Sequence, residues 1–128
     1  MKILIVDNDI NTVEVLQASL LSKVNYEINV AYSGEEALEM MKKNGHYELL
    51  ILDIMMPKIN GLDVCELMMK DEKLKNIPVL LVSALPIAST SFQESLEKFK
   101  ELKLVKDVLE KPFEIDNLVN KVKAIVGK

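Results

Sequence analysis

The chain has 128 residues, of which 49% are hydrophobic and 28% are charged, with a net charge of −4. This composition excludes a disordered chain, the acidic balance without a Lys/Arg block argues against a nucleic-acid surface, and no stretch approaches the roughly 20 apolar residues of a membrane span. A single cysteine, Cys65, excludes an internal disulfide, and a single histidine, His46, excludes a histidine-rich metal site.

The first third of the chain alternates short apolar runs with helical patterns. Residues 2–6 predict a strand that ends at the polar cluster Asp7-Asn8-Asp9, and the spacing of apolar residues predicts a helix over 11–22. Residues 26–31 alternate like a strand. A second helix begins at Ser33, which forms a capping-box pattern with the glutamate three residues later, and ends at a glycine.

The most informative stretch lies near the middle of the chain. Four apolar residues, Leu49–Leu52, run directly into the carboxylate of Asp53, and Pro57 and Gly61 close the segment. An apolar run of this length between turn signals predicts a strand buried on both faces, as in a parallel sheet. Asp53 is then expected at the carboxyl end of that strand, where open α/β sheets bind ligands.

The second half continues the alternation. After Gly61 we expect a helix to about residue 70, followed by a buried strand at 77–82. A capped helix at 91–102, a weaker strand at 105–109 and a last helix at 115–125 complete the chain. Five strands alternating with five helices indicate βα units, and right-handed crossovers then produce a parallel sheet covered on both faces. We expect one domain over 1–128 with no output domain, located in the cytoplasm.

Polar side chains follow four of the predicted strands. They are Asp7, Asn8 and Asp9 after the first strand, Asp53 after the third, Ser83 after the fourth and Lys111 after the fifth. Each has an ordinary structural explanation, such as a helix cap or a surface lysine. Because the carboxyl ends of parallel strands meet at one edge of the sheet, we expect these groups to converge there.

Several chemistries can be tested against this set. Carboxylates after the first strand would repel a phosphate, which excludes dinucleotide, P-loop and flavin sites. His46 is expected at the opposite edge, so a Ser-His-Asp hydrolase is excluded as well. Clustered carboxylate and amide oxygens suit Mg²⁺. Beside such a cation Asp53 would stay ionised and could attack phosphorus, while Lys111 would offset charge on the phosphoryl group and Ser83 could hydrogen-bond it.

At this point the sequence resembles the receiver domains of two-component response regulators, the superfamily of the chemotaxis response regulators. The resemblance covers essentially the whole chain, through I-L-I-V-D-N-D at 3–9, L-L-I-L-D-I-M-M-P-K-I-N-G at 49–61, P-V-L-L-V-S-A at 78–84 and E-K-P-F at 110–113. It implies a flavodoxin-like, doubly wound five-stranded parallel sheet with strand order 2-1-3-4-5.

The resemblance also implies roles for individual residues. Asp53 matches the phosphoacceptor, Asp7 and Asn8 match the acidic pair that binds Mg²⁺, and the backbone carbonyl of Met55 matches a further ligand. Two more matches are Ser83, with the hydroxyl that follows phosphorylation, and Lys111, with the phosphate-binding lysine of a cis Lys-Pro bond. The implied partners are a histidine kinase or phosphotransfer protein as donor and a downstream protein whose identity the sequence does not give.

Three departures from the family pattern stand out. Asn8 replaces an acid, which predicts weaker Mg²⁺ binding and makes Asp9 a candidate substitute ligand. Val108 occupies the position of the family's switch aromatic, so the usual coupling to Ser83 is not expected. The segment between Ser83 and Lys111 is about six residues longer than is typical, with the extra length expected within 84–104.

Three functional hypotheses therefore remain. The first is a phosphoacceptor in a phosphorelay, which is not an enzyme beyond slow self-dephosphorylation. The second is a pseudo-receiver that binds partners without phosphorylation, which Asn8 and Val108 favour. The third is a small metal-dependent phosphatase, which would need Asp9 as acid or base. Cys65 and the methionine pairs 40–41 and 68–69 are interpreted as core residues, and Met55 and Met56 as residues at the mouth of the site.

Overall fold

Five strands and the helices between them follow the predicted order in the computed structural model. The structure describes residues 2–23, 26–44, 46–56, 58–84, 94, 97 and 103–127. The strands are β1 (Lys2–Val6), β2 (Glu27–Ala31), β3 (Leu49–Asp53), β4 (Val79–Ser83) and β5 (Val105–Glu110). The helices are α1 (Ile10–Lys23), α2 (Gly34–Asn44), α3 (Gly61–Met69) and α5 (Ile115–Val126). Apart from Glu94 and Glu97, the helix predicted at 91–102 lies outside the described residues, as does most of the longer segment at 84–104.

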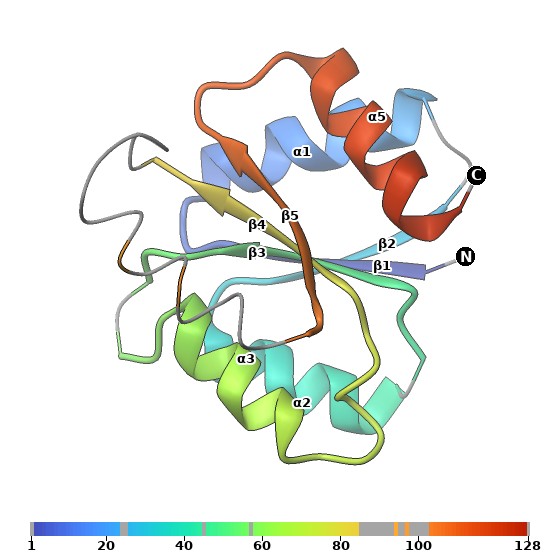
Figure 1. Ribbon diagram of the computed structural model, residues 1–128. Coiled ribbons are helices and arrows are strands. Elements are labelled where there is room, and N and C mark those ends of the chain that lie inside the picture. The colour runs from blue at the N-terminus through green and yellow to red at the C-terminus, as the bar shows by residue number, and fades with distance from the viewer. Residues whose placement is uncertain are drawn as a thin grey trace.

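The sheet confirms the predicted topology. All four strand pairs are parallel, and the order is β2-β1-β3-β4-β5. Helices α1 and α5 cover one face and α2 and α3 cover the other, as Figure 1 shows. All strands therefore end at the same edge, because parallel neighbours run in the same direction. None of the described helices is long and apolar enough to cross a membrane.

Side chains of the central strands divide between two cores, one on each face. Leu50 and Leu52 pack with Val64, Cys65 and other residues on the α2/α3 face, whereas Ile51 packs on the α1/α5 face. All five residues of β3 are buried, because successive side chains of a strand point to opposite faces and both faces are covered. This explains why the sequence of β3 is continuously apolar up to Asp53. Cys65 is fully buried, as predicted.

Some boundaries differ from the prediction. The fourth strand begins at Val79 and not at residue 77, because the N–H of Ile77 donates to the Leu74 carbonyl and closes the turn after α3.

Met56 also differs from its predicted place at the mouth of the site. Its side chain is 9% exposed and belongs to the α2/α3 core, although Met55, its neighbour, is 57% exposed.

The edge strand β5 is less regular than its neighbours. Its pairing with β4 slips between Val79 and Leu80, so that Lys106 has no partner in the register. This is the arrangement of a β-bulge. Lys121 of α5 holds the strand from outside, with its Nζ 2.9 Å from Oδ2 of Asp107. Val108 is only partly buried, and it packs toward the α2/α3 core.

Candidate functional site

Two carboxylates lie side by side at the carboxyl edge of the sheet. Asp7 follows β1 directly and Asp53 is the last residue of β3, and these strands are neighbours in which Val6 pairs with Leu52. The carboxylates are almost inaccessible, since Asp7 is 1% and Asp53 5% exposed. The apolar strands therefore carry both acids to the rim of the core and fix them there.

A lysine from the turn after β5 lies between these acids. The Nζ of Lys111 is 2.9 Å from Oδ2 of Asp7 and 3.8 Å from Oδ1 of Asp53. The Lys111–Pro112 peptide bond is cis, as the family resemblance implied. Ser83, at the end of β4, is completely buried, and its carbonyl accepts a 2.7 Å hydrogen bond from the N–H of Lys111. The sequence prediction that these residues converge on one edge is therefore met for Asp7, Asp53, Ser83 and Lys111.

The charges of the site do not balance. Burial, followed by the charge of neighbouring Asp7, raises the pKa of Asp53 to about 6, and the ammonium of Lys111 offsets only part of this rise. One lysine faces two buried carboxylates, so the group retains an uncompensated negative charge when both acids are ionised. A further cation at this edge would relieve that repulsion.

The loop after β3 holds Asp53 from the other side. The N–H of Ile54 donates to the Val82 carbonyl, and the N–H of Gly61 donates to the Ile54 carbonyl. A Cβ at Gly61 would lie 2.9 Å from the Asp53 carbonyl oxygen, so only glycine allows α3 to begin this close to the strand. The N–H of Met55 points at Oδ1 of Asp53, at 3.4 Å.

Sequence reasoning missed how α3 begins. Asn60 caps the helix by accepting from the N–H of Asp63, and Asp63 accepts in return from the N–H of Asn60. The signal was present, because an asparagine followed three residues later by an acid is a variant of the capping box. Lys58 just before it has a φ of 67°, in the left-handed region. Pro57 lies outside the described residues.

The structure gives Asp9 a different set of contacts from the site residues. Its Oδ1 accepts from the N–H of Asn11 and its Oδ2 from the hydroxyl of Thr12, so it caps α1. The hydrogen bond from Thr12 is the largest cause of a lowered pKa for Asp9. Both carboxylate oxygens are thus used, which favours a structural role, and its service as a substitute metal ligand stays a prediction. Asn8 is exposed at the turn between β1 and α1, directly after Asp7 in the sequence.

The donor set fits Mg²⁺ in kind. Within the described part of the chain, no three His, Cys, Asp or Glu side chains gather into a metal site by themselves. Mg²⁺ does not require that, because it is usually bound by one or two carboxylates and keeps several waters. Asp7 and Asp53 would supply the carboxylates, and the uncompensated charge described above is what a divalent ion would neutralise.

Comparison with known proteins decides the family. Residues 3–123 match the model of the response regulator receiver domain. The chain belongs to this family. The receiver fold and the strand order of two-component response regulators, which the sequence predicted, are thereby confirmed.

The receiver is similar to curated regulators that are longer than this chain. It is 36% identical over 128 residues to a CpxR homolog, a transcriptional regulatory protein of Haemophilus influenzae, and 29% identical over the same length to the response regulator ArlR of Staphylococcus aureus. These alignments cover 99% of the chain but only 51% and 53% of the relatives. The chain thus spans about half the length of these regulators.

Solved structures agree with the fold over the whole chain. A putative response regulator from Chloroflexus aurantiacus matches with a TM-score of 0.85 and 34% identity, covering 99% of this chain and 98% of that one. The response regulator TrrA of Thermotoga maritima, solved in complex with Mg²⁺ and BeF, matches with a TM-score of 0.79 and 34% identity, covering 97% of each chain.

Proposed function

We propose that the receiver accepts a phosphoryl group on Asp53 from a histidine kinase or a phosphotransfer protein in the cytoplasm, with Mg²⁺ as cofactor, and that the modification changes a partner-binding surface. The observation that carries the proposal is the placement of Lys111 between two buried carboxylates, 2.9 Å from Asp7 and 3.8 Å from Asp53. A single ion pair that only stabilised the fold would not need a second buried acid.

The residues divide the chemistry between them. An oxygen of Asp53 attacks phosphorus, the bond from phosphorus to the donor's histidine nitrogen breaks, and the imidazole leaves. Bound Mg²⁺ would supply positive charge that offsets the charge on the phosphoryl group. Asp7, Asn8 and the Met55 carbonyl would hold the ion with Asp53. Lys111 would transfer its ammonium from the carboxylates to the phosphoryl oxygens, and the Ser83 hydroxyl would donate to one of them.

Access to the site suits a protein donor. An open pocket of about 460 Å³ lies next to Lys111, between α1 and the turn that leads into α5, and Val15, Ala84 and Phe113 contribute to its walls. It is mostly apolar, so an apolar side chain of the donor could anchor there while the histidine approaches Asp53. No turnover of a small substrate is needed, and the chain would not act as an enzyme beyond slow self-dephosphorylation.

Phosphorylation can be tested directly with a small-molecule donor. Acetyl phosphate with Mg²⁺ should add one phosphoryl group to the intact protein by mass spectrometry. Asp53→Asn should abolish the addition, and Lys111→Met should slow it because the phosphoryl charge loses its ammonium partner. A protein that never gains the group from acetyl phosphate or phosphoramidate would contradict the proposal.

A pseudo-receiver remains the second candidate because Asn8 and Val108 depart from the family pattern. Beryllofluoride with Mg²⁺ separates the two. A phosphoacceptor should show shifted amide NMR signals around Asp53, Ser83 and Lys111, and the Asp53→Ala protein should not respond. A docking module would leave the signals of both proteins unchanged, and turnover of a phosphate ester would instead favour a phosphatase.

A further inference from the structure

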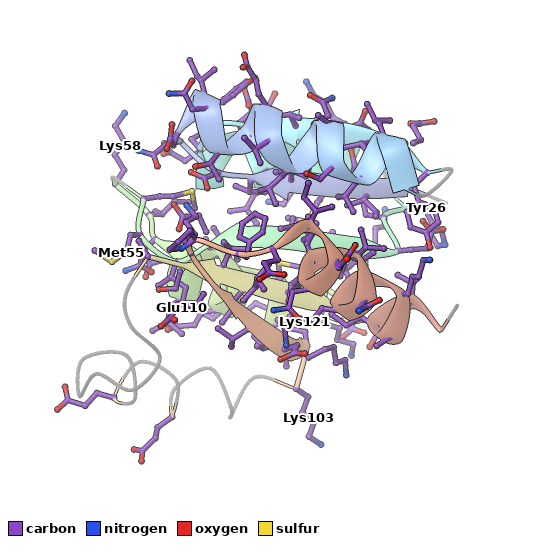
Figure 2. All side chains as sticks on the ribbon, turned by 90° about the horizontal axis from the view of Figure 1, so that it is seen from above. Tyr26, Met55, Lys58, Lys103, Glu110 and Lys121 are labelled. Atoms are coloured by element: carbon purple, nitrogen blue, oxygen red, sulfur yellow. The ribbon has the colours of Figure 1, made fainter. Side chains whose placement is uncertain are left out.

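Met55 is the most exposed of the methionines that the structure describes. Its side chain is 57% exposed, whereas Met41, Met56 and Met68 are buried at 9% exposure or less. Met40 and Met69 are partly buried and pack against the α2/α3 core. Figure 2 shows the Met55 side chain at the same end of the molecule as Lys58, with Tyr26 at the opposite end. A solvent-borne oxidant would therefore meet Met55 before the other methionines of the described residues.

The backbone of Met55 is fixed even though its side chain is free. Its N–H lies 3.4 Å from Oδ1 of Asp53, and the preceding residue, Ile54, is tied at both its N–H and its carbonyl. The side chain must then begin within a few bonds of the phosphoacceptor. We therefore expect a change in the polarity of this side chain to change the hydration of the loop that holds Asp53.

We propose that Met55 is a peroxide-sensitive modification site whose sulfoxide shortens the lifetime of phospho-Asp53. The Met55 sulfur donates an electron pair to one oxygen of a peroxide. An S–O bond forms as the O–O bond breaks, sulfur is oxidised by two electrons, and the second peroxide oxygen leaves as water or alcohol. The lifetime part of this inference rests on the proposed phosphorylation of Asp53.

The sulfoxide would act through water. We expect an apolar thioether at this position to hold no water next to the phosphoryl group, whereas a sulfoxide oxygen accepts hydrogen bonds. A water held there can attack phosphorus. The bond from phosphorus to the Asp53 oxygen then breaks, the water's proton passes to the released inorganic phosphate, and the carboxylate returns. One added hydrogen bond in the transition state corresponds to roughly a fivefold faster hydrolysis.

Cys65 does not compete for the oxidant. Its side chain is completely buried, and burial raises the pKa of its thiol to about 12, so the reactive thiolate is scarce. The other methionines of the described residues are buried or packed against the α2/α3 core. Among the methionines that the structure describes, the selectivity for Met55 thus follows from exposure.

The experiment uses limiting hydrogen peroxide on the whole chain. Peptide mass spectrometry should find the sulfoxide at Met55 first, and phospho-Asp53 formed with acetyl phosphate should then hydrolyse about fivefold faster. Methionine sulfoxide reductases should restore the original rate. Met55→Leu should have a peroxide-insensitive lifetime, Met55→Gln should be fast without peroxide, and the matched variant Met69→Leu should keep the full response.

Each outcome decides one part of the inference. Sulfoxide appearing at Met40 or Met69 before Met55 would overturn the site, and a complete Met55 sulfoxide with an unchanged hydrolysis rate would overturn its regulatory effect. If the unoxidised protein gains no phosphoryl group, the proposed function and the lifetime effect fail together. The position of the first sulfoxide still decides the modification site in that case.

Discussion

The two sides of the site are built differently. The acids stand on β1 and β3, central strands that are buried on both faces, while Lys111 follows β5, an edge strand with a bulge and exposed residues. Asp7 and Asp53 are therefore held by the core, whereas Lys111 is held by β5, an edge strand that pairs only with β4. The difference indicates that the two acids, Asp7 and Asp53, which we call the anionic wall, are held rigidly, while the Lys111 side chain can move. A site needs this arrangement if its ammonium must change partners.

Core truncation should reveal this contrast most strongly. Leu50→Ala in β3 removes a side chain with no exposed surface and should cost about 3–4 kcal/mol of unfolding free energy, whereas Val108→Ala in β5 should cost about 1 kcal/mol. Urea unfolding of both variants measures the difference. Equal losses would mean that β5 is packed as firmly as the centre of the sheet.

The repulsion between the buried carboxylates of Asp7 and Asp53 can be measured from the pH dependence of the unfolding free energy. Because the pKa of Asp53 is raised to about 6 from an ordinary 3.8, the folded state loses stability as pH rises from about 4 to 6 and Asp53 ionises. Asp53→Asn removes this loss and should stabilise the metal-free protein by roughly 2 kcal/mol above pH 7, with no gain below pH 4. Thermal unfolding in EDTA across this range is the measurement.

A matched control is available for that variant. Asp116→Asn changes an exposed acid in the first turn of α5 and should lose a few tenths of a kcal/mol at neutral pH. If Asp53→Asn behaved in the same way, the pair of buried carboxylates would carry no strain.

A further carboxylate next to Asp7 and Asp53 should strengthen Mg²⁺ binding at the anionic wall. Asn8→Asp supplies a third carboxylate at this edge and should tighten Mg²⁺ binding about tenfold, equivalent to roughly 1.4 kcal/mol, since the amide ligates without a charge. Titration of Mg²⁺ followed by NMR compares the two proteins. Identical affinities would remove Asn8 from the ligand set.

The smallest effect is expected at the outer support of β5. Lys121→Met removes the 2.9 Å ion pair with Asp107, which is partly exposed, and should cost about 0.5 kcal/mol. A local rise in amide hydrogen exchange along β5, with β3 unchanged, would locate the effect. A loss above 2 kcal/mol would show that β5 depends on this pair.

Much of this arrangement could be predicted from the sequence because apolar runs determine which strands are buried. Leu49–Leu52 has no polar residue, so the strand had to be central, and Asp53 had to emerge at its end. The hydrogen-bond partners of each carboxylate could not be predicted. Asp9 belongs to the same polar cluster as Asp7, yet Thr12 and Asn11 occupy both its oxygens.

Backbone irregularities were also beyond the sequence. The slip at Lys106 depends on how β5 meets β4, and the positive φ of Lys58 on the closure of the loop before α3; neither leaves a residue pattern. The burial of Met56 beside an exposed Met55 depends on the same loop. These features depend on how segments far apart in the sequence pack together, which the local residue pattern does not indicate.

The hydrogen bond from the N–H of Lys111 to the Ser83 carbonyl has a consequence for the chain between them. This contact of 2.7 Å fixes the hydroxyl-bearing residue and the ammonium-bearing residue relative to each other directly. We expect insertions or deletions that fall before β5 to leave this spacing unchanged, because the pairing of β5 with β4 is kept. Under the proposed function, changes in that connection would alter which proteins the receiver recognises and would leave Ser83 and Lys111 in place beside Asp53.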